Sequence, residues 1–276
     1  MMFARILSTA RIEFAIALRN RWVAVGVVLM VLFSLVLSLA GAGSAGSLAA
    51  DPLSVTVASL TSLSVYLVPL IALLISFDAI AGEVERGTLP LHLTYPLSRS
   101  EMLLGKLAAQ LAVVAIAVGA GYGLAAGYAF LTAGGDAFAG LPALWRLIWS
   151  STLLGAGFLS LGHMMSALAR RPSGAAALAI GLWLIMIVLY DLGLLAAIVA
   201  DDGGVFTTDI FPWALILNPA DAFRIYNLAA SDAVSAVSGL AGAASSIAIW
   251  KPLASLLLWP VLAAFAARFA FGRVTP

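Results

Sequence analysis

DAIAGEVERGTLPLHLTYPLSRSEMLLGK, residues 78–106, lies between two long apolar segments and decides how the chain is organised. Seven of the chain's 14 basic and 13 acidic residues fall within it: Asp78, Glu83, Glu85, Arg86, Arg99, Glu101 and Lys106. The flanking segments have about 20 or more residues each, which is enough to cross a bilayer. Residues 78–106, here called the elbow, are therefore predicted to be a polar loop between two membrane spans.

Local signals in the elbow predict short helical pieces. Gly87 can end one helix and Thr88 can cap the next, because Thr is a good N-cap. Ser98 or Ser100 can cap a third helix that carries Glu101 in its first turn, where a negative charge is favourable. Leucines add apolar contacts: Leu89, Leu91, Leu93 and Leu97. The elbow is expected to be a stiff amphipathic segment at the membrane surface, although its charge alone favours an ordinary solvated loop.

The composition is that of an integral membrane protein. The 276 residues are 63% hydrophobic and only 10% charged, whereas soluble domains carry about 25% charged residues. The net charge of +1 gives no indication of nucleic-acid binding. The absence of cysteine excludes disulfides, thiolate metal sites and cysteine nucleophiles.

Six apolar stretches are predicted to be membrane-spanning helices of a single domain, residues 1–276: 22–40, 53–77, 102–131, 144–169, 173–200 and 250–271. Residues 1–21 place arginines among apolar residues at helical spacing, which is typical of a basic amphipathic helix at the membrane surface. Residues 78–101 connect spans 2 and 3, and residues 201–249 form a large loop between spans 5 and 6. Within that loop, 233–249 are mostly Ala, Ser and Gly, which insert weakly, so a surface helix is expected there.

The charge bias predicts the orientation of the chain. With six spans, one side of the membrane holds both termini, the elbow and most of the 14 basic residues: Arg5, Arg11, Arg19, Arg21, Arg86, Arg99, Lys106, Arg170, Arg171, Arg268 and Arg273. The other side holds Arg146, Arg224 and Lys251. The positive-inside rule then places both termini and the elbow in the cytoplasm, as expected for a multi-pass protein of a bacterial inner membrane.

Motifs for catalysis are lacking. The chain has no GxxxxGK[ST], HExxH or GxSxG, so we expect neither a P-loop nor an enzyme. His163, Met164 and Met165 are ligand types for soft metals, but adjacent helical residues point in different directions, so packing is preferred and no metal site is predicted. Asp191 is a candidate functional group by default, although its place near the outer end of span 5 equally suits a solvated structural role.

Gly119, Gly123 and Gly127 form two successive GxxxG steps in span 3. Small residues at this spacing allow two helices to approach closely. We expect these glycines to form a packing seam within the subunit, with a contact between two subunits as the alternative.

The order of residues in the elbow is similar to that in the cytoplasmic loop of type-2 ABC export permeases. The pattern E-x-E-R-G-T-L, then Y-P-L-S-R, then G-K matches at Glu83, Glu85, Arg86, Gly87, Thr88, Leu89, Tyr95, Pro96, Ser98, Arg99, Gly105 and Lys106. In that family the loop carries a coupling helix that docks into an ATP-binding subunit. The resemblance implies an all-α permease that binds no cofactor itself, with ATP and Mg²⁺ held by the partner ATPase. The implied coupling residues are Glu83, Glu85, Arg86, Gly87, Thr88, Leu89, Leu91 and Leu93.

The outer loop contains NPADAFRIYNL, residues 218–228, a mixture of charged and aromatic residues that is typical of protein interfaces. Eight residues are predicted to bind a periplasmic partner: Phe211, Trp213, Asn218, Asp221, Phe223, Arg224, Tyr226 and Asn227. An amphipathic belt that caps the bundle is the alternative. With the six-span plan, this segment resembles the permeases of transporters that help mature the copper centres of nitrous oxide reductase.

That narrower resemblance implies a set of partners: a second copy of the chain, two cytoplasmic ATPase subunits and a periplasmic accessory protein. The cargo would be a sulfur species or copper, or the permease would move the periplasmic partner mechanically. Three other functions stay open. They are an ABC exporter of drug, lipid or peptide, a stand-alone secondary transporter, and a structural membrane anchor.

Overall fold

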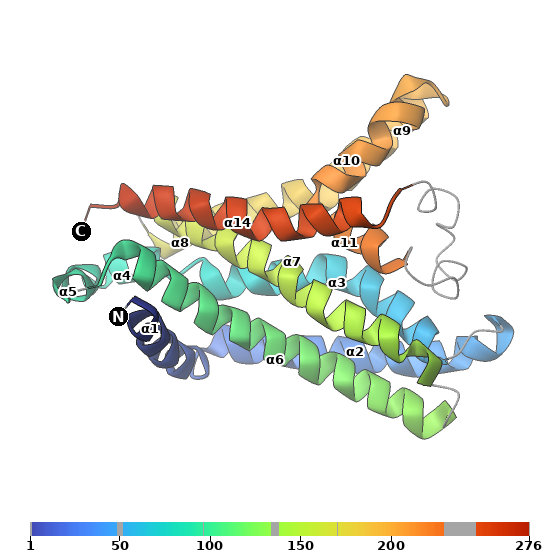
Figure 1. Ribbon diagram of the computed structural model, residues 1–276, viewed down its shortest axis with the longest axis horizontal. Coiled ribbons are helices and arrows are strands. Elements are labelled where there is room, and N and C mark those ends of the chain that lie inside the picture. Colours follow the sequence, from blue (N-terminus) through green and yellow to red (C-terminus); the bar gives the residue numbers. More distant parts are fainter. Residues whose placement is uncertain are drawn as a thin grey trace.

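The chain folds into a bundle of long apolar helices (Figure 1). The computed structural model describes residues 2–48, 52–95, 97–133, 138–169, 171–228 and 247–275, and no strand occurs among them. The first half contains α1 (Met2–Ala17), α2 (Arg21–Leu48), α3 (Pro52–Ser76), α4 (Ala81–Glu85), α5 (Leu89–Thr94) and α6 (Arg99–Ala133). The second half contains α7 (Leu141–Leu168), α8 (Pro172–Trp183), the π-helix η2 (Leu184–Leu189), α9 (Tyr190–Asp201), the π-helix η3 (Phe206–Ile210), α10 (Phe211–Leu217), α11 (Pro219–Leu228) and α14 (Trp250–Gly272).

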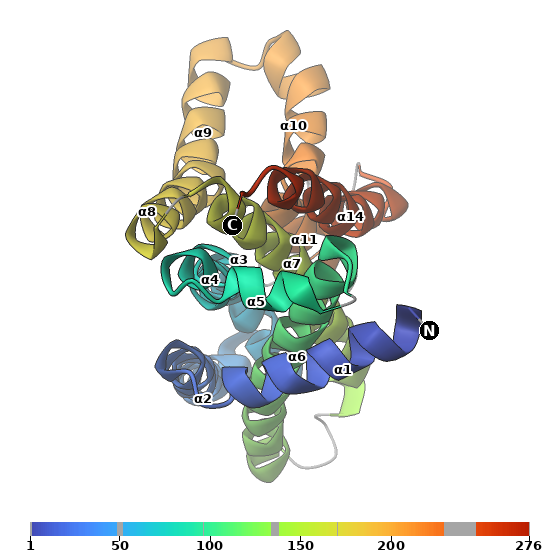
Figure 2. The same cartoon turned by 90° about the vertical axis from the view of Figure 1, so that its left-hand side faces the viewer.

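Six stretches of the described residues are long and apolar enough to cross a membrane: Arg21–Leu39, Leu53–Glu85, Arg99–Thr132, Phe138–Leu168, Pro172–Asp201 and Trp250–Gly272. This confirms the predicted all-α membrane protein with six spans. The expected surface helix at 233–249 lies largely outside the described residues. The expected helix at 1–21 corresponds to α1, which packs across α6 at one end of the bundle (Figure 2).

Helix α7 lies at the centre of the bundle and packs against α3, α6 and α14. Its buried face is rich in serine and glycine, and such small residues let membrane helices approach closely. One polar link joins three spans, because the Tyr122 hydroxyl contacts Ser64 Oγ and lies 3.3 Å from Ser151 Oγ. The buried hydroxyl groups therefore satisfy one another where water is absent.

The fifth span is not one regular helix, because the π-helix η2 separates α8 from α9. A π-helical turn weakens the regular ladder of backbone hydrogen bonds, and here the Asn218 side-chain amide donates a bond of 2.6 Å to the Met186 carbonyl oxygen. Beyond η2, α9 and α10 form two arms that project away from the bundle (Figures 1 and 2). No residue of α9 or α10 is buried.

The predicted glycine seam within the subunit is wrong. A methyl group added at Gly119, Gly123 or Gly127 would meet nothing within 4 Å. The glycine that packs is Gly121, where an added methyl would lie 3.1 Å from the Met30 carbonyl oxygen on α2. The three predicted glycines instead occupy the face of α6 that points away from α2.

Candidate functional site

The elbow lies at the same end of the bundle as both termini (Figure 1). Its first helix, α4, is fixed to the end of α7 by Ser166. The Ser166 hydroxyl oxygen accepts hydrogen bonds of 2.9 Å from the backbone N–H groups of both Ile80 and Ala81. Because the first N–H groups of a helix lack partners within that helix, this contact from α7 caps α4 in a buried setting.

Lys106 on α6 connects α4 to the N-terminal helix. Its ammonium group donates to Glu83 Oε1 at 2.5 Å and to Glu13 Oε1 at 2.6 Å, and Lys106 is only 3% exposed. A buried charge is costly unless it is paired and hydrogen-bonded, so these contacts hold α1, α4 and α6 together. The sequence pattern did not predict this cluster, because Glu13 is 93 residues from Lys106.

Close contact of α1 with α6 also requires Gly105. A methyl group at this position would lie 2.6 Å from Thr9 Cβ and 3.2 Å from the Ile6 carbonyl oxygen. At the start of α6, Arg5 of α1 reaches Glu101 with a separation of 3.8 Å. The N-terminal helix is therefore seated on the elbow by a close approach and by ion pairs.

The caps of the elbow helices agree with the prediction at one place and differ at another. Ser98 and Glu101 form a reciprocal capping box at the start of α6, with the Ser98 N–H donating to Glu101 Oε2 at 2.7 Å and the Glu101 N–H donating to Ser98 Oγ at 3.2 Å. Thr88 precedes α5, but its hydroxyl makes no capping bond there. It donates instead to the Glu83 carbonyl oxygen at 3.3 Å and closes the end of α4.

The last span is attached to the elbow through Arg99. Its guanidinium donates to the carbonyl oxygens of Phe271 at 2.5 Å and Val274 at 2.9 Å, and it lies over the Phe271 ring. Carbonyl groups at the C-terminal end of a helix lack partners within the helix and favour a cation. Arg99 therefore joins the start of α6 to the end of α14.

Six of the eight predicted coupling residues divide into a buried group and an exposed group. Glu83 and Leu89 are buried and hold the elbow together, so they do not present a docking surface. Glu85, Arg86, Gly87 and Leu91 are exposed, and the φ angle of 68° at Gly87 explains the glycine there. Thr88 is half-buried, and the side chain of Leu93 lies outside the described ones.

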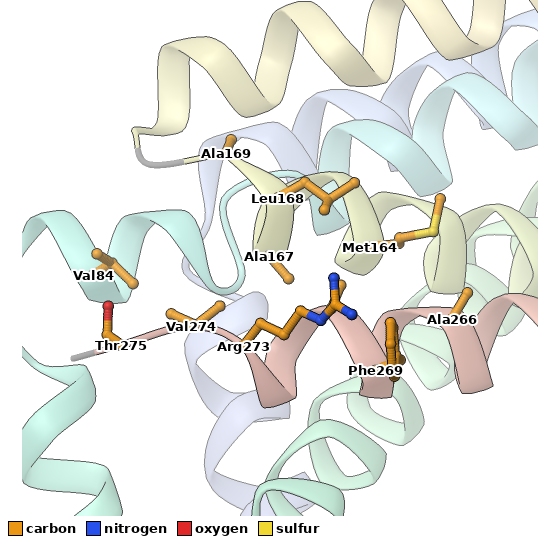
Figure 3. Close-up of a pocket in the computed structure, with 11 residues that line it drawn as sticks. Val84, Met164, Ala167, Leu168, Ala169, Ala266, Phe269, Arg273, Val274 and Thr275 are labelled. Atoms are coloured by element: carbon orange, nitrogen blue, oxygen red, sulfur yellow. The ribbon is translucent and has the colours of Figure 1, made fainter.

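A pocket of about 770 Å³ opens beside α4, between the ends of α7 and α14 (Figure 3). Val84, Leu168 and Val274 contribute apolar walls, and Arg273 is the charged residue that lines it. The guanidinium of Arg273 also lies 4.2 Å from the Phe269 ring centroid. The pocket therefore adjoins the elbow, because Val84 of α4 forms part of its wall.

The predicted periplasmic partner site is largely internal. Helix α11 packs against α3, α7 and α14, and five of the eight predicted residues are buried: Asn218, Asp221, Phe223, Tyr226 and Asn227. Phe211 and Arg224 are half-buried, and Trp213 is 60% exposed. Buried residues cannot contact a partner without rearrangement, so the expectation of a belt that caps the bundle describes α11 better.

The polar residues of α11 have partners within the bundle. Asn227 donates to Ser150 Oγ at 3.0 Å, and Asn218 accepts the Ala220 N–H at 2.9 Å as the cap of the helix. Arg224 lies 3.0 Å from Asp191 and 3.3 Å from Asp221. Asp191 thus belongs to a structural ion pair, the second of the two roles considered for it.

His163 lies in the core. It is fully buried, and its Nδ1 is 2.8 Å from the Leu159 carbonyl oxygen. Among the residues that the structure describes, no three His, Asp or Glu side chains are arranged to hold a metal ion.

The fold is that of a multi-pass helical membrane protein with a polar elbow between spans 2 and 3. The family described as ABC-2 family transporter protein matches residues 7–274, and the chain belongs to this family. The chain is 42% identical over 258 residues to the probable ABC transporter permease protein NosY of Pseudomonas aeruginosa, covering 93% of this chain and 92% of that protein. It is 38% identical over 262 residues to the protein of the same name from Stutzerimonas stutzeri, covering 95% and 93% of the two chains.

Proposed function

We propose that this chain is the permease of a NosDFY-type transporter and couples ATP hydrolysis by a NosF-like cytoplasmic ATPase to movement of its own spans. Two permease copies associate with two ATPase subunits, which bind ATP and Mg²⁺, and with a periplasmic NosD-like accessory protein. The transporter exports a sulfur species or copper, or controls the periplasmic protein mechanically, so that the copper sites of nitrous oxide reductase can mature. The similarity to two proteins named NosY over more than nine-tenths of each chain supports this proposal.

The observation that carries the coupling role is the attachment of α4 on two sides. Ser166 binds its first N–H groups from α7, and Lys106 binds Glu83 from α6. Because buried, fully packed elements move as units rather than deforming continuously, a push on the elbow passes to α6 and α7 together. Lys106 also pairs with Glu13, so α1 follows the same movement.

The docking surface for the ATPase consists of the exposed elbow residues and the adjoining pocket. Arg86 and Glu85 offer charges of both signs, and Leu91 and Tyr95 are each 64% exposed. Arg273 adds a cation at the pocket. An apolar centre with a charged rim is the usual make-up of a protein interface.

The test is copurification of the chain from its native membranes in mild detergent, with mass spectrometry of the associated proteins. Leu91→Asp and Arg86→Glu are expected to lower recovery of the ATPase, and its stimulated ATP hydrolysis, by about ten-fold or more, as for loss of an interface anchor. Arg171→Glu is the matched control, because Arg171 is exposed at the start of α8 outside the elbow.

Each outcome has a consequence. An ATPase together with a periplasmic protein supports the proposal, whereas an ATPase alone favours an ABC exporter of another cargo. If no ATPase is recovered even after crosslinking, or if Leu91→Asp and Arg171→Glu behave alike, the proposed docking surface is wrong.

A further inference from the structure

An apolar groove runs along the outer half of the sixth span, at the end of the bundle away from the elbow. It lies between α10 and the first turns of α14, with Tyr190 of α9 at one side. Its volume of about 630 Å³ falls within the range of small-molecule sites. The exposed side chains of Leu258 and Leu262 continue its floor along α14.

Two hydrogen bonds fix the walls of this groove. The Tyr190 hydroxyl donates to the Ala214 carbonyl oxygen at 2.7 Å, and Trp259 Nε1 donates to the Leu217 carbonyl oxygen at 2.9 Å. These bonds tie α10 to α9 on one side and to α14 on the other. The groove is therefore preformed and requires no ordering of its walls when a ligand binds.

The chemistry of the groove changes along its length. At the end of the span, Lys251 Nζ lies 4.4 Å from the ring centroid of Trp213, beside the 63% exposed Trp250. In its described surroundings Lys251 has this aromatic partner and no acidic one. Tryptophan is enriched at membrane interfaces, and a lysine ammonium binds phosphate as a point charge. The Lys251 ammonium group thus lies at the depth of the membrane interface, at one end of the apolar groove.

We propose that this groove binds an anionic glycerophospholipid, with its headgroup phosphate at Lys251 and an acyl chain along Leu258 and Leu262. The charge of the groove residues and their depth in the membrane match the headgroup and the acyl chains of such a lipid. The cation and the two tryptophans sit where a headgroup lies, and the leucines sit where the chains lie. The groove opens on a face of α14 whose side chains at Val261 and Phe265 are exposed as well, so a lipid can enter directly from the bilayer.

The experiment uses the full chain reconstituted in liposomes, with a photoreactive acyl group on either phosphatidylglycerol or phosphatidylcholine. Labelling by phosphatidylglycerol is expected in the peptides of α10 and α14. Lys251→Gln should lower this labelling about five-fold, the effect of one basic residue near an anionic headgroup, and should leave labelling by phosphatidylcholine unchanged. Ala254→Trp, which fills the groove, should lower labelling by both lipids.

Arg146→Gln is the matched control, since it removes a basic residue on the same side of the membrane that lies over Tyr226 rather than in the groove. It should label like the wild type, and monodisperse elution of each variant checks its folding. Equal labelling by the two lipids, or unchanged labelling of Lys251→Gln, would overturn the proposal. A second copy covering the groove would also overturn it, and would appear as a disulfide between two Ala254→Cys chains in this otherwise cysteine-free sequence.

Discussion

The ammonium group of Lys106 lies 2.5 Å from Glu83 Oε1, and both side chains are almost fully buried. This contact binds α4 of the elbow to the third span, and the bond from Lys106 to Glu13 extends the cluster to the N-terminal helix. Glu83 therefore acts inside the subunit. In the proposed docking the elbow would meet its partner through Glu85, Arg86 and Leu91, whereas Glu83 keeps the elbow attached to the bundle.

Replacing Lys106 by Met should destabilise the protein by about 3–5 kcal/mol, because it removes the cation that two buried carboxylates share. The midpoint of thermal unfolding in detergent, followed by tryptophan fluorescence, measures the effect. Adding Glu13→Gln and Glu83→Gln should restore most of the stability, since neutral residues of similar size tolerate burial. A single Lys106→Met variant that unfolds at the wild-type temperature would contradict a buried ion cluster.

Replacing Arg99 by Ala should loosen the C-terminal end of α14. Hydrogen bonds to a charged group contribute about 1.5–3 kcal/mol, so local opening should increase by about ten-fold or more. A single cysteine at Ala270, a buried position near the end of α14, reports the opening through its rate of reaction with maleimide. Arg99→Lys should react at a rate between those of the wild type and Arg99→Ala, because lysine keeps the charge but lacks the planar fork of donors. Equal rates for Arg99→Ala and an Arg171→Ala control would show that Arg99 does not hold this end.

Replacing Gly105 by Ala should push α1 away from α6, because the new methyl would lie 2.6 Å from Thr9 Cβ. Overpacking of this kind costs about 1–3 kcal/mol. Faster tryptic cleavage after Arg11 would report the loosened helix, together with a lower unfolding temperature. Gly123→Ala is the control, since an added methyl there meets nothing within 4 Å. If both variants are cleaved at the wild-type rate, the close approach at Gly105 does not hold α1.

Hydropathy was sufficient to predict the six spans, because the need for about 20 apolar residues acts on each segment separately. The cap at Ser98 was also predictable, since a capping box spans only four residues. Contacts between segments that are far apart in the sequence could not be predicted. Lys106 looked like the end of a loop, and nothing in its neighbourhood indicates that it points toward Glu13 on another helix.

Residues 218–228 show a different limit of prediction from sequence. Charged and aromatic residues are typical of interfaces, yet an internal helix whose polar groups are all needed for packing has the same composition. In α11, Asn227 binds Ser150 and Arg224 binds Asp191, so both side chains are used within the bundle. Only the packing of α11 against three spans distinguishes the two cases.

Asp221 should make stability depend on pH. Burial raises the pKa of its carboxyl from 3.8 to about 7; the charge of Asp191 also raises it, and Arg224 opposes the increase. Between about pH 4 and pH 7 the folded state therefore keeps a proton that the unfolded chain has lost, so stability falls as the pH rises through this window.

The substitution Asp221→Asn removes this titration, while Arg224 retains its ion pair with Asp191. Relative to the wild type, its unfolding temperature should rise from pH 5 to about pH 7 and level off by pH 8. Asp209→Asn, at an exposed site on η3, should show no such trend; a constant difference between Asp221→Asn and wild type across this range would mean that the Asp221 carboxyl is already ionised at pH 5.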